Sequence, residues 1–346
     1  MKAISRVLSS AGLLVLTAIL VAAAKKMPLA FLGWYPGFSG KVLDVIGNVT
    51  SVFPFPLWEV LAVLLLVWLL VSLIKSLPHG RILRWAAGVL LAASVGVFLF
   101  VGLWGLNHFL PTKTSQIVQV QEASVQSLQA AALHYGKKAG ELADTVARDD
   151  DGRPDLGDYL ALAGDGFQGQ PALTLPKKAP LEVKKLFAGK VFSYLGTTGI
   201  FVPYTAEACI NPDTYPASLP YVACHELAHR TGAASEEDAN FVAFLTASAN
   251  PDPRYQYSAY YSAFLYCFNA LQELAPEAAQ QVWASCTEQL RADLDGAGAH
   301  YAPYEGKVQD VAKTVNDAYL KAFDEAGVKS YDLVANALVA WYEKNS

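Results

Sequence analysis

Three long apolar runs occupy the first third of the chain, at residues 7–24, 57–74 and 85–106. The first and third contain no charged residue, and the second contains only Glu59, near its start. A helix of about 20 apolar residues is long enough to cross the hydrocarbon core of a bilayer. The pattern therefore predicts a membrane region at residues 1–110 with three transmembrane helices, followed by a separate domain at residues 111–346.

The first apolar run permits a second interpretation. It follows Lys2 and Arg6 and ends in an Ala-x-Ala sequence at residues 22–24, as a cleaved signal peptide does. Because two further spans follow, we favour a retained anchor, and both interpretations give the same orientation. Residues 31–56 are rich in aromatic residues, Gly and Pro, which predicts a loop at the membrane interface.

Helical periodicity dominates the chain beyond residue 110. Residues 114–147 predict one long amphipathic helix or two, and residues 257–274 predict a helix with an aromatic face. Further helices are expected at residues 276–293, 308–325 and 331–343, with Gly327 capping the second of these.

Two segments interrupt this helical pattern. Residues 176–185 are rich in Pro and Lys and predict a connector. Residues 191–204 combine β-branched and aromatic residues with Gly196 and Gly199, which favours an extended segment or a bent strand. The expected fold class is mainly α: three transmembrane helices and a mostly helical α+β domain with a small sheet or an edge strand.

Composition and charge narrow the class of protein. Of 346 residues, 53% are hydrophobic and only 16% are charged, which is more apolar than an ordinary soluble protein. A net charge of -5 makes nucleic acid an unexpected partner. Basic residues near the ends of the spans favour the cytoplasmic side, so we expect a multi-pass membrane protein with a cytoplasmic N-terminus and an extracytoplasmic C-terminal domain. The residues behind this orientation are Lys2, Arg6, Lys75, Arg81 and Arg84, with Lys25 and Lys26 arguing weakly for the reverse.

All four cysteines follow the last apolar run. An even number in an exported domain permits two disulfides, whereas four small buried thiols fit the same sequence. Spacing does not decide between these alternatives for Cys209, Cys224, Cys267 and Cys286.

The candidate chemistry lies in residues 221–247. His225, Glu226 and His229 form the pattern H-E-x-x-H. Residues four apart on a helix share a face, so both imidazoles can reach one metal ion while Glu226 lies beside it as a general base. The flanks support a helix, with Ser218 as N-cap and Gly232 as the stop.

A zinc site requires a third protein ligand. Ser235 is suited to cap a second helix that begins at Glu236, so Glu236 is the candidate ligand and Asn240 is expected to hydrogen-bond a ligand imidazole. The alternative is a core helix that contains histidines by chance, since the bare pattern occurs in roughly one chain in a hundred of this length. The acids after Ser235 also suit any helix N-terminus.

The HELAH motif followed by E-x-x-A-N resembles the gluzincin pattern of HtpX-like and CAAX-prenyl-protease-like membrane metallopeptidases. That resemblance implies Zn²⁺ bound by His225, His229 and Glu236, with Glu226 as the catalytic base. Asn240 departs from those families, which have Asp at its position.

The chain is also similar to an uncharacterised bacterial family of integral-membrane HELAH proteins, a domain of unknown function. The similarity implies the site and the topology but no substrate. It lies in WYPGFSG (34–40), FPFPLWEV (53–60), WGLNHF (104–109), GIFVPYTAEACIN (199–211), HELAHRTGAASEEDANFVAFL (225–245) and NDAYLKAFDEAGVKSY (316–331).

In zincin enzymes an edge strand beside the zinc helix pairs with the substrate backbone. By this resemblance, Gly199, Ile200 and Phe201 are the candidate substrate-binding residues. We expect a membrane-anchored zinc metalloprotease that hydrolyses peptide bonds with a metal-activated water, its partners being a peptide or protein substrate and the lipid bilayer. The alternatives are a membrane sensor and a structural protein, each with a zincin-like site that does not turn over.

Overall fold

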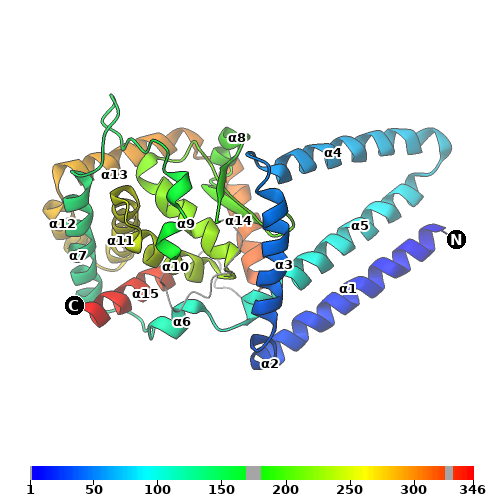
Figure 1. The fold of residues 1–346 in the computed structure, drawn as a ribbon, viewed down its shortest axis with the longest axis horizontal. Helices are drawn as coiled ribbons and strands as arrows, with labels where there is room; N and C mark the ends of the chain where they lie inside the picture. Colours follow the sequence, from blue (N-terminus) through cyan, green and yellow to red (C-terminus); the bar gives the residue numbers. More distant parts are fainter. Residues whose placement is uncertain (1, 169–180, 324–329) are drawn as a thin grey trace. The chain divides into compact units, whose positions relative to one another are not determined.

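The structure is a computed structural model that describes residues 2–168, 181–323 and 330–346. It is mainly helical with one small mixed sheet, as the sequence predicted (Figure 1). The chain forms two compact units. The first comprises Met1–Pro111 with Val202–Glu207, and the second comprises Thr112–Phe201 with Ala208–Ser346. No sequence pattern indicated that residues 202–207 belong with the N-terminal unit.

Three helices among the described residues of the first unit are long and apolar enough to cross a membrane. They are α1 (Lys2–Lys26), α4 (Leu57–Ser76) and α5 (Ile82–Leu103), which confirms the three apolar helices expected. Most of their side chains are not covered by protein, as lipid-facing helices require. The third ends at Leu103 rather than at residue 106, and a 3₁₀ turn, η2 (Gly105–Phe109), continues the chain.

Helices α1 and α5 lie side by side (Figure 1). The guanidinium of Arg6 donates to the carbonyl of Arg84 at 3.0 Å. Helices α4 and α5 are joined by a short 3₁₀ turn, η1 (Leu77–His79), and by Gly80 in the left-handed region. The start of α1 and the α4–α5 turn therefore lie at the same end of this unit.

The prediction of a loop at residues 31–56 was wrong, because most of this segment is helical. It contains α2 (Pro28–Leu32) and α3 (Tyr35–Thr50). Pro36 lies in the first turn of α3, where a helix tolerates proline. The buried face of α3 packs on the end of α5, where Ser39 donates to the Leu103 carbonyl at 2.5 Å and Tyr35 to that of Val101 at 3.2 Å. These distant contacts outweigh the local preference of Gly and Pro for loops.

Residue Glu207 caps the second apolar helix. Its carboxylate accepts hydrogen bonds from the backbone N–H of Leu57 at 2.8 Å and of Trp58 at 2.9 Å. These two donors open α4, where Pro56 provides no side-chain cap. A carboxylate at a helix N-terminus accepts from N–H groups that lack partners within the helix. Its negative charge also interacts favourably with the positive end of the helix dipole. The sequence predicted no role for Glu207.

The second unit is built around α7 (Val125–Ala143) and α11 (Pro253–Leu274), which pack along each other. The predicted amphipathic region at residues 114–147 is two helices, α6 (Lys113–Ile117) and α7, and the aromatic helix at residues 257–274 is confirmed as α11. The single helix expected at residues 276–293 is two, because Thr287 caps a new helix. The remaining described helices of this unit are α8 (Gly189–Tyr194), α9 (Leu219–Arg230), α10 (Glu236–Ala249), α12 (Pro276–Ser285), α13 (Glu288–Tyr301), α14 (Lys307–Ala322) and α15 (Ser330–Asn345), and the expected cap Gly327 lies outside the described residues.

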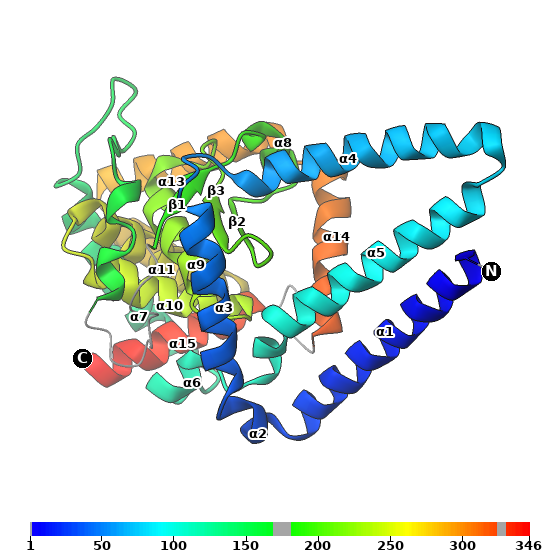
Figure 2. The ribbon, with the colours of Figure 1, turned by 45° about the vertical axis from the view of Figure 1, so that its right-hand side comes forward.

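In the part of the chain that the structure describes, the sheet has three strands in the order β1-β3-β2 and lies beside α9 (Figure 2). They are β1 (Val183–Lys185), β2 (Gly199–Val202) and β3 (Glu207–Ile210), with β1 parallel to β3. Strand β1 occupies the end of the segment expected as a connector, whose residues 176–180 lie outside the described part. The order places β2 at an edge of the sheet, where an extended segment was predicted.

The extended prediction for residues 191–204 was wrong in its first half, which is the helix α8. Gly196 has a φ of +69° and ends this helix. Its N–H donates to the Ser193 carbonyl, and the N–H of Thr197 donates to that of Phe192, the pattern of a glycine C-cap. The chain then turns directly into β2.

All four cysteines are buried thiols outside any disulfide, so the buried-thiol alternative holds. Burial raises the pKa of the Cys224 thiol to about 12, which leaves it protonated and unreactive.

Candidate metal centre

The histidine helix α9 begins as predicted but by a different cap. Ser218 occupies the N-cap position, as predicted, but it ends a 3₁₀ turn, η5 (Pro216–Ser218), and its side chain makes no cap hydrogen bond. The hydroxyl of Ser258, on α11, instead accepts from the backbone N–H of Tyr221 at 2.9 Å. The stop is as predicted, since Gly232 follows the helix with a φ of +94°.

The turn after Gly232 leads directly into α10. Ser235 caps this helix by accepting from the N–H of Asp238 at 3.4 Å, which confirms the predicted cap. Helices α9 and α10 pack on each other, and the fully buried Ala239 and Ala243 leave room for close approach. The Asp238 carboxylate also accepts from the N–H of Lys113 and of Thr114, which ties the first turn of α10 to α6.

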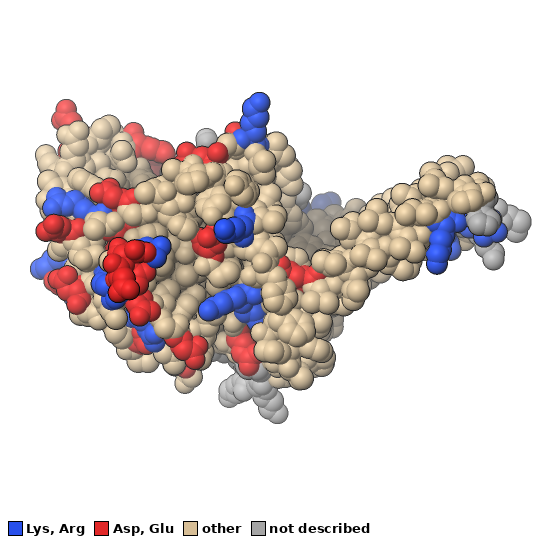
Figure 3. All heavy atoms as spheres, turned by 90° about the horizontal axis from the view of Figure 1, so that it is seen from above, with Lys and Arg blue, Asp and Glu red and all other residues tan. Residues whose placement is uncertain are grey.

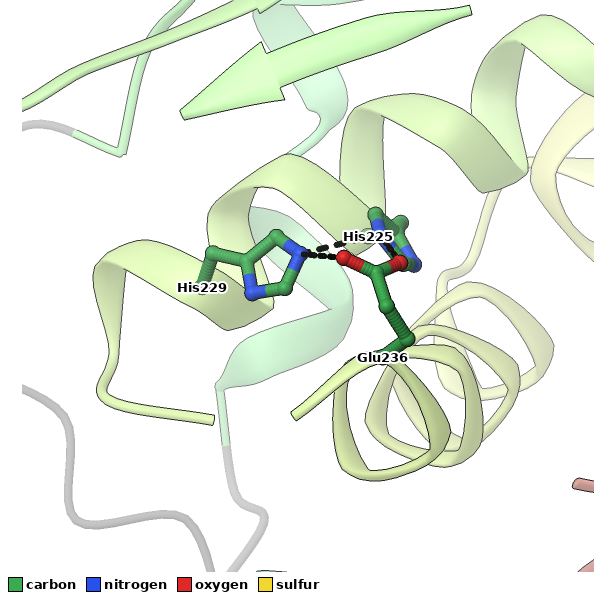
Figure 4. Close-up of side chains that lie close together, drawn as sticks. All are labelled: His225, His229 and Glu236. Carbon is green, nitrogen blue, oxygen red and sulfur yellow. Dashed lines mark hydrogen bonds and ion pairs between the residues drawn. The ribbon is translucent and has the colours of Figure 1, made fainter. Parts of the chain in front are cut away.

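The three predicted ligands converge (Figure 4). The Nε2 atoms of His225 and His229 are 3.0 Å apart. One carboxylate oxygen of Glu236 is 3.4 Å from His225 Nε2, and the other is 3.6 Å from His229 Nε2. All three ligand atoms lie within 4.8 Å of one another. Two imidazole nitrogens and one carboxylate oxygen are a donor set that suits Zn²⁺.

The surroundings of the cluster also fit a metal. His229 Nδ1 lies 2.8 Å from the Ala233 carbonyl, which holds the proton on Nδ1 and leaves Nε2 to ligate. Burial alone lowers the pKa of His229, but the Glu236 carboxylate raises it to about 9. Burial likewise opposes ionisation of Glu236, yet its hydrogen bonds to both imidazoles hold its pKa well below the usual range. The carboxylate is therefore an anion directed at the point where the ring nitrogens meet.

Glu226 lies beside this point and is 3% exposed. Its Oε2 atom is buried with no hydrogen-bond partner among the described residues. Burial raises the pKa of Glu226 to about 7, against the opposing influence of His225 and His229. A carboxyl group with a pKa near neutrality and an unpaired oxygen is equipped to accept and return a proton.

Strand β2 passes directly over Glu226. A Cβ atom placed on Gly199 would lie 2.4 Å from Glu226 Oε1, so only glycine allows the strand this close. The expected substrate-binding residues Gly199, Ile200 and Phe201 thus lie on an edge strand next to the candidate base, and all three are partly exposed.

Asn240 does not occupy the position we predicted. Its Oδ1 atom accepts from the phenols of Tyr266 at 2.9 Å and Tyr221 at 3.2 Å. Nδ1 of His229 faces a backbone carbonyl instead, and Nδ1 of His225 has no hydrogen-bond partner among the described residues. Buried hydroxyls need acceptors, and Asn240 provides one for two tyrosines between α9, α10 and α11.

Asn211 is a positioning residue that the sequence analysis did not assign. Its side-chain N–H₂ donates to Ser193 Oγ at 2.9 Å and to the Thr197 carbonyl at 3.1 Å, while Oδ1 accepts from the N–H of Asp213. These bonds hold the turn that leads into β2. The sequence N-P-D after a strand was the available signal, since Asn commonly forms such a side-chain turn.

A family model described as "Protein of unknown function (DUF3810)" matches residues 33–339. The chain belongs to this family. Comparison of this DUF3810 protein with curated proteins and with solved structures found no match in either set. The family match covers all four residues of the candidate centre, and the gluzincin resemblance rests on the sequence motif alone.

The cluster predicts specific zinc binding that depends on Glu236. We expect Glu236→Gln to weaken zinc affinity by more than about a hundred-fold, since loss of even an outer partner of a ligand costs 10–100-fold. The matched control is Glu237→Gln, one residue along the same helical turn, which should keep wild-type affinity. Competition with a chromophoric chelator measures both, and equal affinities would rule out Glu236 as a ligand.

The pKa of about 9 at His229 predicts that zinc binding releases a proton. Below about pH 9 the imidazole holds a proton that the metal must displace, so apparent affinity rises with pH and levels off above that value. Calorimetric titration at about pH 8 in buffers of different ionisation enthalpy should show about one proton released per zinc, and none at about pH 10. The same heat in every buffer at both pH values would contradict this prediction.

Proposed function

We propose that this protein is a membrane-anchored zinc metallopeptidase. The observation that carries the proposal is the convergence of His225, His229 and Glu236 on one point beside the buried carboxyl of Glu226. Two imidazoles and one carboxylate leave a fourth position for water or substrate, which is the arrangement of catalytic rather than structural zinc.

Zinc at this point would supply a Lewis acid that lowers the pKa of water and polarises a carbonyl group. Glu226 takes a proton from the attacking water through its unpaired oxygen. The water oxygen bonds to the peptide carbon, the C–N bond breaks, and Glu226 returns the proton to the leaving amine. Without metal, burial raises the pKa of Glu226 to about 7, and a divalent cation beside it would lower this pKa and favour the carboxylate that accepts the proton.

Strand β2 supports a peptide as the substrate. It lies at the edge of the sheet, and an extended chain can add to such an edge through backbone hydrogen bonds that do not depend on sequence. Gly199 brings this edge next to Glu226, so an added peptide would have its backbone beside the candidate base.

The basic residues support an extracytoplasmic site. Arg6 and Arg84 meet at the end of the first unit that also contains the α4–α5 turn, and basic side chains gather at this end of the apolar helices (Figure 3). That end belongs on the cytoplasmic side. The chain leaves α5 at the opposite end and continues into the second unit, which is then outside the cytoplasm.

Replacing the base should separate catalysis from metal binding. We expect Glu226→Gln to keep zinc at wild-type affinity but to lower kcat by at least about a thousand-fold, since general base catalysis contributes 10²–10⁴-fold. Peptide hydrolysis by protein purified in detergent, with zinc measured by mass spectrometry, tests both parts. Undiminished hydrolysis by the zinc-loaded variant would refute the mechanism.

The close approach of β2 gives a steric test. A methyl group at Gly199 collides with Glu226, so Gly199→Ala should lower kcat/KM by about a hundred-fold, the effect of a misplacement of about 1 Å, while zinc stays bound. Gly298→Ala is the control, because a Cβ atom there meets nothing within 4 Å. Equal kcat/KM values for the two variants would show that the position of β2 does not matter to the reaction.

A further inference from the structure

Helices α8 and α14 and the residues that flank α8 expose large apolar side chains on the second unit. Val311 and Val315 on α14 are 64% and 65% exposed, and Val191 on α8 is 59% exposed. This surface, named here the α8–α14 face, consists of Phe187, Val191, Tyr194, Leu195, Val308, Val311, Val315 and Tyr319.

The segment around α8 meets the segment around α14. The ring of Tyr194 meets edge to face, at 5.1 Å, that of Tyr304, in the turn before α14, and Gly196, just after α8, lies against the side chain of Gln309 on α14. Between them is an open groove of about 840 Å³ lined largely by Leu195, Val308, Val311, Val315 and Tyr319. Figure 2 shows α8 and α14 as neighbours.

Helix α14 has the pattern of a helix that lies on a membrane surface. Val308, Val311, Val315 and Tyr319 recur every three or four residues and share one face, while Lys, Asp, Gln and Thr occupy much of the remaining surface and Leu320 is buried. Isolated apolar side chains on a soluble surface are ordinary, but exposed apolar side chains that gather around one groove mark an interaction site. An apolar stripe at the water boundary, flanked by lysines, is typical of helices in the interfacial plane.

Charge favours an anionic bilayer as the partner. Residues 185–195 and 307–322 together contain five lysines and two aspartates, whereas the whole chain has a net charge of -5. Phe187, Tyr194 and Tyr319 add the aromatic rings that prefer the headgroup region. The same chain contains three helices able to cross a membrane, so a lipid surface is always within reach of this unit.

We propose that the α8–α14 face docks on the surface of the bilayer in which the chain is anchored, with its valines and aromatic rings among the lipid headgroups and its lysines against lipid phosphate. The contact is separate from the candidate metal centre and holds whether or not the protein is a peptidase. It restricts the second unit to orientations in which α14 lies along the membrane.

The test uses full-length protein in vesicles of phosphatidylcholine and phosphatidylglycerol at about 3:1. The native cysteines are all buried, so a single exposed cysteine, Val311→Cys, can be labelled with an environment-sensitive fluorophore. We expect nitroxide-labelled lipids to quench this probe at least about threefold more than a probe at Lys137→Cys, which is highly exposed on α7. As a control for folding, the melting temperature of each variant should equal that of the wild-type protein.

Charge reversal supplies the second arm. Lys307→Glu with Lys313→Glu should reduce quenching at position 311 in the anionic vesicles and leave it unchanged in pure phosphatidylcholine. Equal quenching at positions 311 and 137 would overturn the proposal. So would an apolar environment at position 311 without lipid quenching, together with disulfide crosslinks between two copies of the unlabelled Val311→Cys variant, because a second copy would then cover the face. The Glu226→Gln variant should show the same lipid quenching at position 311 as the protein with Glu226. The outcome of the peptidase assay therefore does not affect this test.

Discussion

The packing of the first turn of α10 on one face of α9 is the contact on which the candidate centre depends. It brings an ionised carboxylate to two imidazole nitrogens in a largely buried place, where an unpaired charge would be costly. The chain holds this contact with local devices. Gly232 reverses the chain within a few residues, Ser235 starts α10, and Asp238 anchors the same turn to α6. Buried alanines on α10 remove the bulk that would keep the helices apart.

A second constraint is steric and concerns the approach of β2 to Glu226. At Gly199 the backbone lies so close to Glu226 that a Cβ atom there would collide with the carboxyl side chain. The position of the strand is set by the turn before it, in which Gly196 ends α8 and Asn211 holds the Thr197 carbonyl. The hydrogen bonds of this turn therefore fix the backbone edge beside Glu226.

The first unit uses polar contacts to complete its apolar helices. Glu207 satisfies the opening N–H groups of α4, and α3 donates side-chain hydrogen bonds to carbonyls at the end of α5. Helix ends leave backbone groups without partners inside the helix, and these groups are expensive to leave unpaired near lipid. Residues far apart in the chain supply the missing partners, which explains why residues 202–207 belong with the N-terminal helices.

Features that depend on near neighbours could be predicted from the sequence. Long apolar runs specify the three apolar helices. Spacing of four residues places His225 and His229 on one face, and Gly232 and Ser235 mark the turn between α9 and α10. Which distant groups meet became known only from the folded chain. Folding made residues 35–50 and 189–194 helical against their composition, directed Asn240 to two phenols rather than to an imidazole, and gave Ser258 the capping role expected of Ser218. These outcomes differ from the predictions because hydrogen bonds and packing between segments far apart in sequence outweigh local propensities of a few tenths of a kcal/mol per residue.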